Sequence, residues 1–189
     1  MTWSVIVIYV TQFARQTGEL TERARDGDTL ALGQLYELFL DRIFRFIRFR
    51  VSTAEDAEDI TQEVFLKMWR GLKSYRAGGV PFEAWLFKIA RNSVIDHYRK
   101  QKPAISFQNA PPIADTKKSP QDTALESISK QEVLNKLKKL KPAYQEIIIL
   151  KFIEERETKE ISTIMDKPAA HIRVLQSRAL NALKKVINN

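Results

Sequence analysis

A proline-rich stretch in the middle of the chain constrains the fold most. The segment QKPAISFQNAPPIADTKKSPQD has no hydrophobic periodicity and holds four of the seven prolines, Pro103, Pro111, Pro112 and Pro120. Proline removes a backbone donor and restricts the residue before it, so the segment suits neither a helix nor a central strand. The sequence therefore predicts two small modules joined by a flexible linker over residues 103–130.

Amphipathic helical patterns lie on both sides of this linker, and no strand pattern occurs past residue 13. We expect helices over about 20–25, 29–51, 53–74 and 82–101 before the linker, and over about 134–140, 142–153, 158–165 and 169–187 after it. Asp28 is a good N-cap, and Ser52 with Glu55 fits a capping box. The predicted fold class is all-α, with an unassigned extension (1–18), a helical bundle (19–102), the linker (103–130) and a helix-turn-helix module (131–189).

Composition narrows the function classes. The 189 residues include no cysteine, which excludes disulfides, cysteine-based zinc sites and thiol catalysis and fits a reducing cytoplasm. The formal net charge of +8 favours a polyanionic partner, either nucleic acid or an anionic membrane surface.

The segment WSVIVIYV near the N-terminus, Trp3–Val10, is apolar but too short to span a bilayer. It lacks the basic start and small-residue cleavage site of a signal peptide, so we expect no membrane insertion. The segment is interpreted as a short strand or an adventitious extension.

An acidic run, AEDAEDITQEVFLKMW, places carboxylates and an amide on neighbouring helical turns: Asp56, Asp59, Gln62 and Glu63. The carboxylates could hold a divalent metal for phosphoryl chemistry, but no histidine or distant acidic partner completes such a site. They could also be a solvated face. A third interpretation is a protein docking surface, because the large aromatics Phe65 and Trp69 flank the run.

The segment PFEAWLFKIARNSVIDHYRKQ interleaves aromatic and basic residues. Basic side chains bind phosphates and aromatic faces stack on unpaired bases, which indicates a single-strand binding surface. The glycines of the preceding YRAGGV loop favour close approach of backbone to a ligand. The alternative is a core helix with a solvated basic edge.

The last two predicted helices are separated by the short turn Asp166-Lys167-Pro168, the spacing of a helix-turn-helix. Apolar residues of the final helix form one stripe. The residues outside this stripe are predicted to face outward: His171, Arg173, Gln176, Ser177 and Arg178. Arginine and glutamine recognise guanine and adenine in the major groove by bidentate hydrogen bonds. A helical hairpin that binds no DNA is the alternative.

These motifs occur in the order of a known family. DAEDITQEVFLKMWRGLKSY followed by PFEAWLFKIARNSVIDHYRK closely resembles conserved region 2 of bacterial sigma factors. KLKPAYQEIIILKFIEERETKEISTIMDKPAAHIRVLQSRALNALKK resembles region 4. The spacing, the absence of region 3 and the small size are similar to the extracytoplasmic-function (ECF) group of the sigma-70 family. The likeness covers about residues 19–102 and 131–187.

The resemblance implies a promoter-specificity subunit of RNA polymerase that is no enzyme and needs no cofactor or metal. Region 2 would dock on the β′ clamp coiled coil of core polymerase through Asp59, Gln62, Glu63, Phe65 and Trp69. It would melt and capture the minus-10 element through Arg76, Trp85, Lys88, Asn92, Asp96 and Arg99. Region 4 would bind the minus-35 duplex through His171, Arg173, Ser177 and Arg178, while its apolar surface meets the β flap.

The resemblance also implies a setting. The linker would thread through polymerase channels, the protein would act in the cytoplasm on a stress or envelope-related regulon, and an anti-sigma factor would hold it inactive. The recognition helix departs from the family at His171, Val174 and Leu175, where threonine, a small hydroxyl residue and a basic residue are usual, and Glu157 stands where a serine cap is common.

Two other functions remain open from the residues alone. A conventional transcriptional regulator would bind an operator through residues 158–187 as a dimer or with a second sensor module, and the acidic run would then have no role. A nucleic-acid enzyme would use the carboxylates at 56–63 in metal-dependent cleavage.

Overall fold

The structure is a computed structural model that describes residues 3–76, 79–101 and 132–188, with side chains from residue 12 onward. Its N-terminal half comprises α1 (Trp3–Arg25), α2 (Thr29–Arg48), α3 (Ala54–Leu72) and α4 (Phe82–Gln101). Its C-terminal half comprises α6 (Pro142–Ile148), a π-helical turn η1 (Ile149–Ile153), α7 (Thr158–Met165) and α8 (Ala169–Ile187). The described ranges contain no strand, and the predicted all-α fold class is confirmed. The predicted linker, 103–130, lies outside the described residues.

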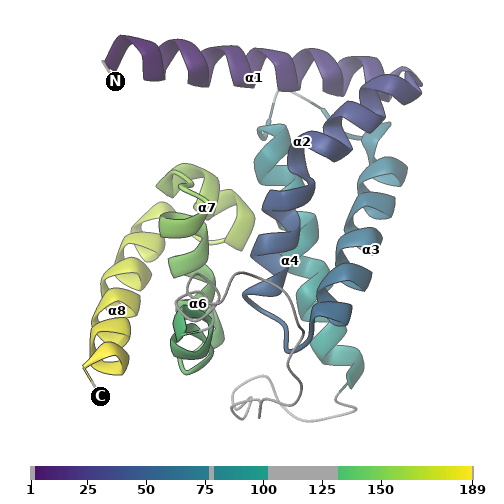
Figure 1. Ribbon diagram of the computed structural model, residues 1–189. Helices are drawn as coiled ribbons and strands as arrows, with labels where there is room; N and C mark the ends of the chain where they lie inside the picture. The colour runs from purple at the N-terminus through teal and green to yellow at the C-terminus, as the bar shows by residue number, and fades with distance from the viewer. Residues whose placement is uncertain (1–2, 77–78, 102–131, 189) are drawn as a thin grey trace.

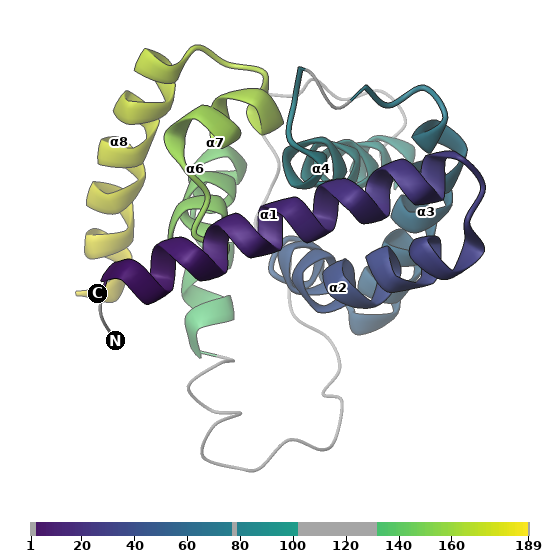
Figure 2. The ribbon, with the colours of Figure 1, turned by 90° about the horizontal axis from the view of Figure 1, so that it is seen from above.

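Helices α2, α3 and α4 form a bundle, and α1 lies across one end of it (Figure 1). Seen from above, α1 continues beyond the bundle toward the C-terminal helices (Figure 2). The ring of Phe13 on α1 meets that of Phe39 on α2 edge to face, with 6.1 Å between centroids.

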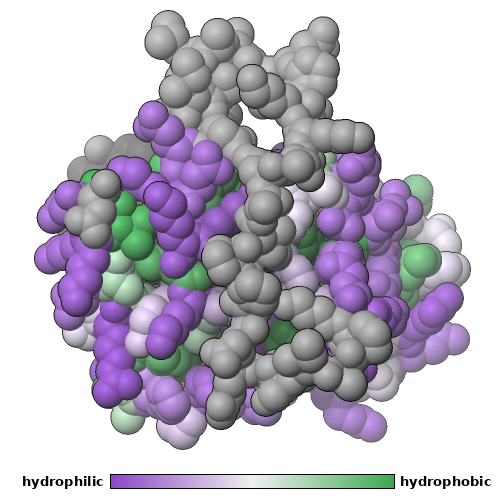
Figure 3. Space-filling model, turned by 90° about the horizontal axis from the view of Figure 1, so that it is seen from below, coloured by the Kyte–Doolittle hydropathy of each residue, from purple (hydrophilic) through white to green (hydrophobic). Residues whose placement is uncertain are grey.

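Among the described helices, none combines the length and the apolar character that a membrane span requires. On the face in Figure 3, hydrophilic residues dominate the coloured surface on both sides of the grey segment.

The first helix is longer than the sequence indicated. We expected a short strand or an extension over Trp3–Val10 and a helix from about residue 20, but one helix runs from Trp3 to Arg25. Thr17, Leu20 and Thr21 recur at helical spacing and are buried at 5%, 6% and 3% exposure. The Thr21 hydroxyl donates to the Thr17 carbonyl at 2.6 Å, which satisfies it inside the helix. Packing of this second half of α1 on the bundle therefore stabilises the helix there.

The core of the bundle comes from one face of α2 and one face of α4. The fully buried side chains of α2 include Leu35, Phe39, Ile43, Phe46 and Ile47, and those of α4 include Leu86 and Phe87. The rings of Phe46 and Phe87 meet edge to face at 5.3 Å, an arrangement that aromatic pairs prefer. Phe87 is completely buried.

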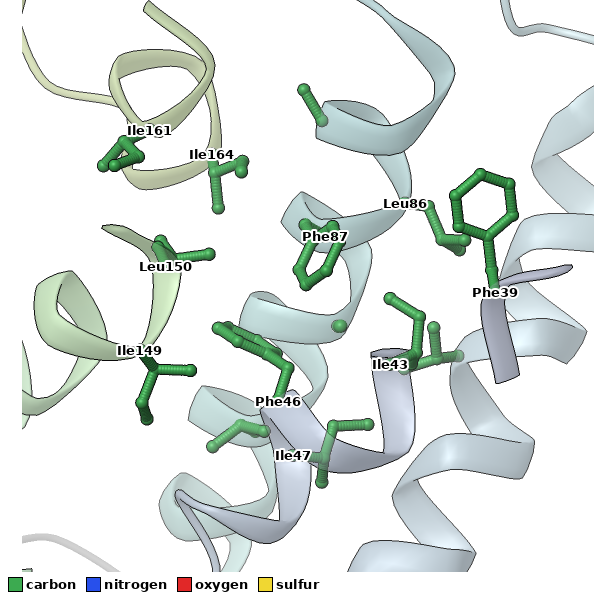
Figure 4. Close-up of a cluster of buried hydrophobic side chains, with 14 of the residues drawn as sticks. Phe39, Ile43, Phe46, Ile47, Leu86, Phe87, Ile149, Leu150, Ile161 and Ile164 are labelled. Atoms are coloured by element: carbon green, nitrogen blue, oxygen red, sulfur yellow. The ribbon is translucent and has the colours of Figure 1, made fainter. Parts of the chain in front are cut away.

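The same core continues into the C-terminal helices. Ile149 and Leu150 of η1, with Ile161 and Ile164 of α7, face Phe46 and Phe87 across the junction (Figure 4). All four isoleucine and leucine side chains are fully buried. Contacts between α4 and α7 are among the most extensive between helices. The two predicted modules therefore pack together through a shared apolar surface.

The helix caps confirm one prediction and correct another. Asp28 caps α2 as expected: its carboxylate accepts from the backbone amides of Leu30 and Ala31 at 2.9 and 3.1 Å. The hydrogen bond from the Ala31 amide, with one from Arg23, lowers the pKa of Asp28. For α3 the predicted Ser52–Glu55 box is wrong, because Thr53 occupies the N-cap and its hydroxyl accepts from the Asp56 amide at 3.0 Å.

Thr53→Val keeps the side-chain shape but removes this acceptor, so we expect the free energy of unfolding to fall by about 1 kcal/mol. Urea unfolding followed by circular dichroism measures the change. Thr53→Ser retains the hydroxyl and should keep most of the stability. If Ser52→Ala lowers the free energy of unfolding by this amount and Thr53→Val does not, the N-cap is Ser52 rather than Thr53.

Candidate polymerase and nucleic-acid interfaces

One face of α3 presents polar and apolar side chains together. Asp59 and Gln62 are exposed, as predicted, and Glu63 is half-buried. Leu66 and Trp69 follow at helical spacing and are 47% and 60% exposed. Asp59, Gln62, Glu63, Leu66 and Trp69 are together called the docking surface. An exposed tryptophan beside polar groups is typical of a protein interface.

Phe65, beneath the docking surface, and Glu63, within it, make contacts inside the protein. Phe65, predicted to dock, is 7% exposed and packs its ring against Tyr36 at 4.6 Å, so it supports the surface from the core. Leu66, which sequence reasoning missed, takes the exposed position. Glu63 forms an ion pair with Lys67 at 2.8 Å, and that hydrogen bond lowers the pKa of Glu63.

The metal-site interpretation of the acidic run finds no support in the geometry. Asp56 accepts from the Thr53 hydroxyl at 2.7 Å and lies 3.5 Å from His97 Nε2. Among the described residues, no group of three or more histidine, cysteine or carboxylate side chains is placed to hold a metal ion.

An aromatic cluster anchors the start of α4. The ring of Trp85 lies 4.9 Å from Tyr75 and 5.7 Å from Phe82, centroid to centroid. Gly71 of α3 permits this packing, because a Cβ there would stand 3.1 Å from the Trp85 ring. The Tyr75 hydroxyl donates to the Val80 carbonyl at 2.6 Å and joins the two ends of the loop. Trp85 is therefore half-buried and firmly oriented.

The polar candidates on α4 continue from Trp85 at intervals of three or four residues, so they share one side of the helix. Asn92 and Arg99 are exposed on this side. Asp96 lies 3.1 Å from Arg99, and Lys88 lies 3.8 Å from Asp166 at the turn before α8. Arg76, in the loop, is also exposed. The structure thus brings the minus-10 candidates of α4 together as one stripe.

Helices α7 and α8 form a helix-turn-helix. Asp166 takes a left-handed conformation with φ of 55°, and the Ser162 hydroxyl donates to the Lys167 carbonyl at 2.6 Å, which closes the turn. Ile172, Leu175 and Ala179 are buried against α6 and α7. Four of the five residues of α8 that were predicted to face outward are exposed: His171, Arg173, Ser177 and Arg178. The fifth, Gln176, is half-buried, and its side-chain amide nitrogen is buried.

Three further residues border this exposed side. Val174 is 47% exposed beside Arg173. Lys151 and Lys159 line a surface hollow together with Arg173. Sequence reasoning missed both lysines, whose ammonium groups are of the kind that contact DNA phosphates. Leu175, where the family usually has a basic residue, is only 8% exposed and packs in the core.

The comparisons with known proteins agree with this arrangement. The family model for sigma-70 region 2 matches residues 35–104, and that for sigma-70 region 4 matches residues 137–185. The ECF RNA polymerase sigma factor SigD of Mycobacterium tuberculosis is 33% identical over 168 residues, which cover 85% of this chain and 79% of SigD. The ECF sigma factor BldN of Streptomyces coelicolor is 34% identical over 171 residues, 89% of this chain and 65% of BldN.

Solved structures show the same fold. CnrH, in complex with the cytosolic domain of CnrY, superposes with a TM-score of 0.73 at 22% identity, over 92% of this chain and 97% of CnrH. RpoE of Bartonella quintana, in complex with the anti-sigma factor NepR, superposes with a TM-score of 0.64 at 24% identity, over 82% of this chain and 96% of RpoE.

The helical fold, the helix-turn-helix and the two matched regions define a bacterial transcription initiation factor. The chain belongs to the ECF group of the sigma-70 family of RNA polymerase sigma factors.

Proposed function

We propose that this sigma factor joins core polymerase through the docking surface of α3, captures the opened minus-10 strand along α4, and binds the minus-35 duplex with α8. The observation that carries the proposal is the exposed row His171, Arg173, Ser177 and Arg178, on the side of α8 opposite its buried face. The second helix of a helix-turn-helix places such residues at base edges.

The docking surface supplies the part of the proposal that an operator-binding regulator would not need. Its exposed Trp69 and Leu66 offer apolar anchors, and Asp59 and Gln62 offer hydrogen-bond acceptors beside them. We assign this surface to the β′ clamp coiled coil. The exposed Phe152 of η1, at 52%, belongs to the apolar surface that we assign to the β flap.

On α4, we assign base stacking to Trp85 and phosphate or base contacts to the exposed Asn92 and Arg99. Asp96, paired with Arg99, orients that guanidinium. Arg76 and Lys88 add positive charge at the loop end of the stripe.

The proposed division of the chain follows from these assignments. Residues 19–102 are the polymerase-docking and minus-10 module, 131–189 the minus-35 module and 103–130 their tether. Because α1 begins at Trp3, its whole length belongs with the first module, and the boundary at 19 falls inside a helix. The protein acts by binding rather than by catalysis, in the cytoplasm where core polymerase works. An anti-sigma partner and a stress or envelope-related regulon are part of the proposal.

Run-off transcription with purified core polymerase tests the proposal. We expect promoter-dependent transcripts only when this protein is added. Absence of both transcript and core binding would refute the assignment. Specific operator binding by the protein alone would instead favour the conventional regulator.

Alanine at both Asp59 and Gln62 should weaken binding to core polymerase at least tenfold, about 1.4 kcal/mol, because two interface hydrogen-bonding groups are lost. Fluorescence anisotropy with labelled protein measures the affinity. The matched control is Gln34→Ala with Glu37→Ala, an exposed amide and carboxylate on α2 that border α1 instead. Equal affinities in the two double variants would remove the docking assignment.

Arg173→Glu should reduce transcription from promoters with a minus-35 element at least tenfold, because a carboxylate repels phosphates and cannot donate to guanine. Core binding should stay unchanged. Lys184→Glu makes the same charge change at an exposed position in the last turn of α8 and serves as control. If both variants lose activity equally, net charge rather than Arg173 determines binding.

A further inference from the structure

The junction between the two halves of the protein buries charged side chains. Glu146 of α6 is 3% exposed and lies between two arginines of the N-terminal bundle. Its Oε1 is 2.8 Å from Arg91 Nε and 3.4 Å from Arg50 Nη1. Burial lowers the pKa of Arg50, while the charge of Glu146 opposes that shift. A buried carboxylate from one half thus compensates guanidinium groups of the other.

A second carboxylate enters the bundle from the end of η1. The side chain of Glu154 is fully buried, and both its oxygens accept from Arg45 of α2, at 2.8 Å from Nε and 3.2 Å from Nη2. Arg42 Nε lies 3.6 Å away. The hydrogen bond to Glu154 raises the pKa of Arg45. Bidentate arginine–carboxylate pairs are among the strongest polar contacts in proteins.

In a third group of ion pairs, the carboxylate belongs to the N-terminal half and an arginine comes from the C-terminal half. Glu83 of α4 pairs with Arg42 of its own half and with Arg156 of the other half. Arg156 also lies 3.1 Å from Glu160 on α7. The three carboxylates Glu83, Glu146 and Glu154, with the arginines they bind, are here called the ionic lock.

The position of the lock brings the two DNA-binding surfaces together. Lys88, a minus-10 candidate, lies 3.8 Å from Asp166, which precedes the recognition helix α8. Promoter elements two helical turns apart are separated by about 70 Å. The two surfaces cannot reach both elements while they abut in this way. The roughly 30 residues between Gln101 and Glu132 could span up to about 100 Å when extended, so the chain length permits separation.

The chemistry of the junction suits an interface that opens. Losing one partner of a buried ion pair leaves an uncompensated charge, which is strongly unfavourable. Separating the halves hydrates both partners at once, so the charged groups oppose opening less than an equal apolar area would. Charge pairs therefore hold the closed arrangement specifically and still permit its release.

We propose that the ionic lock holds this sigma factor in a closed, inactive conformation, and that binding to core polymerase requires its release. The claim that the closed conformation is inactive rests on the proposed function, but the closed conformation itself can be tested without polymerase. A protein that is mostly closed binds its partner with an apparent affinity reduced by the fraction of open molecules. Weakening the lock should therefore tighten binding to core polymerase.

The test uses energy transfer in the full chain. Because the sequence has no cysteine, Lys73→Cys and Lys185→Cys give two exposed labelling sites, one in each half. We expect high transfer in the parent protein and lower transfer after Glu146→Gln with Glu154→Gln. The control, Glu132→Gln with Glu155→Gln, neutralises two exposed carboxylates of the same half and should leave transfer high.

A variant cycle separates opening from misfolding. Glu154→Gln alone leaves Arg45 without its carboxylate and should lower transfer, whereas Arg45→Gln with Glu154→Gln removes both charges and should recover part of it. The lower transfer of the double variant Glu146→Gln with Glu154→Gln should be accompanied by at least threefold tighter core binding. Low transfer in the parent protein, or equal transfer in lock and control variants, would overturn the lock. If energy transfer changes as expected but run-off transcription fails, the proposed function is refuted and the closed conformation is not.

Discussion

The buried pairing of Glu146 and Glu154 with arginines of α2 and α4 is the interaction on which the arrangement of the two halves depends. The apolar surfaces of η1 and α7 complete the core around Phe46 and Phe87, but apolar contact is not directional. The carboxylates fix the register, because each must meet its guanidinium when it leaves water. The Gln145 side chain adds a hydrogen bond to the Phe49 carbonyl at 2.8 Å at the same junction.

The same contacts determine how the proposed interaction surfaces lie relative to one another. The docking surface on α3 and the exposed row on α8 remain open to solvent, whereas the loop end of the α4 stripe lies against the turn of the helix-turn-helix. Exposure of the proposed docking surface is therefore not sufficient in the closed arrangement, because the proposal requires release of the ionic lock for binding to core polymerase and for simultaneous contact with both promoter elements. Under this proposal the lock is released when core polymerase binds, and promoter binding follows.

Sequence periodicity predicted much of this structure because the information is local. The bounds of α4, α7 and α8 agree with the expected ranges, and the exposed side of α8 follows from the spacing of Ile172, Leu175 and Ala179. Asp28 was recognisable as a cap because it acts within three residues of itself. The exposed positions of Asp59 and Gln62 on α3 were recognisable for the same reason.

The remaining features depend on contacts between distant segments. Arg45 and Glu154 are separated by 109 residues, and Arg50 and Glu146 by 96, so no local pattern indicates their pairing. The sequence motif predicts that Phe65 faces outward, but Tyr36 of α2 packs against its ring in the fold. The part of α1 around Thr17, Leu20 and Thr21 was missed because its burial depends on contacts with the distant helices of the bundle.

A reversible cross-link tests most directly the claim that a closed two-module sigma factor must open to act. Lys88→Cys and Asp166→Cys, whose parent side chains lie 3.8 Å apart, can be joined by a short bismaleimide that contains a reducible disulfide. The linked protein and the same protein after reduction are then compared in run-off transcription with core polymerase. The account predicts little transcript while the link is intact and recovery, after reduction, to the level of the unlinked double variant. Equal transcription before and after reduction would contradict it.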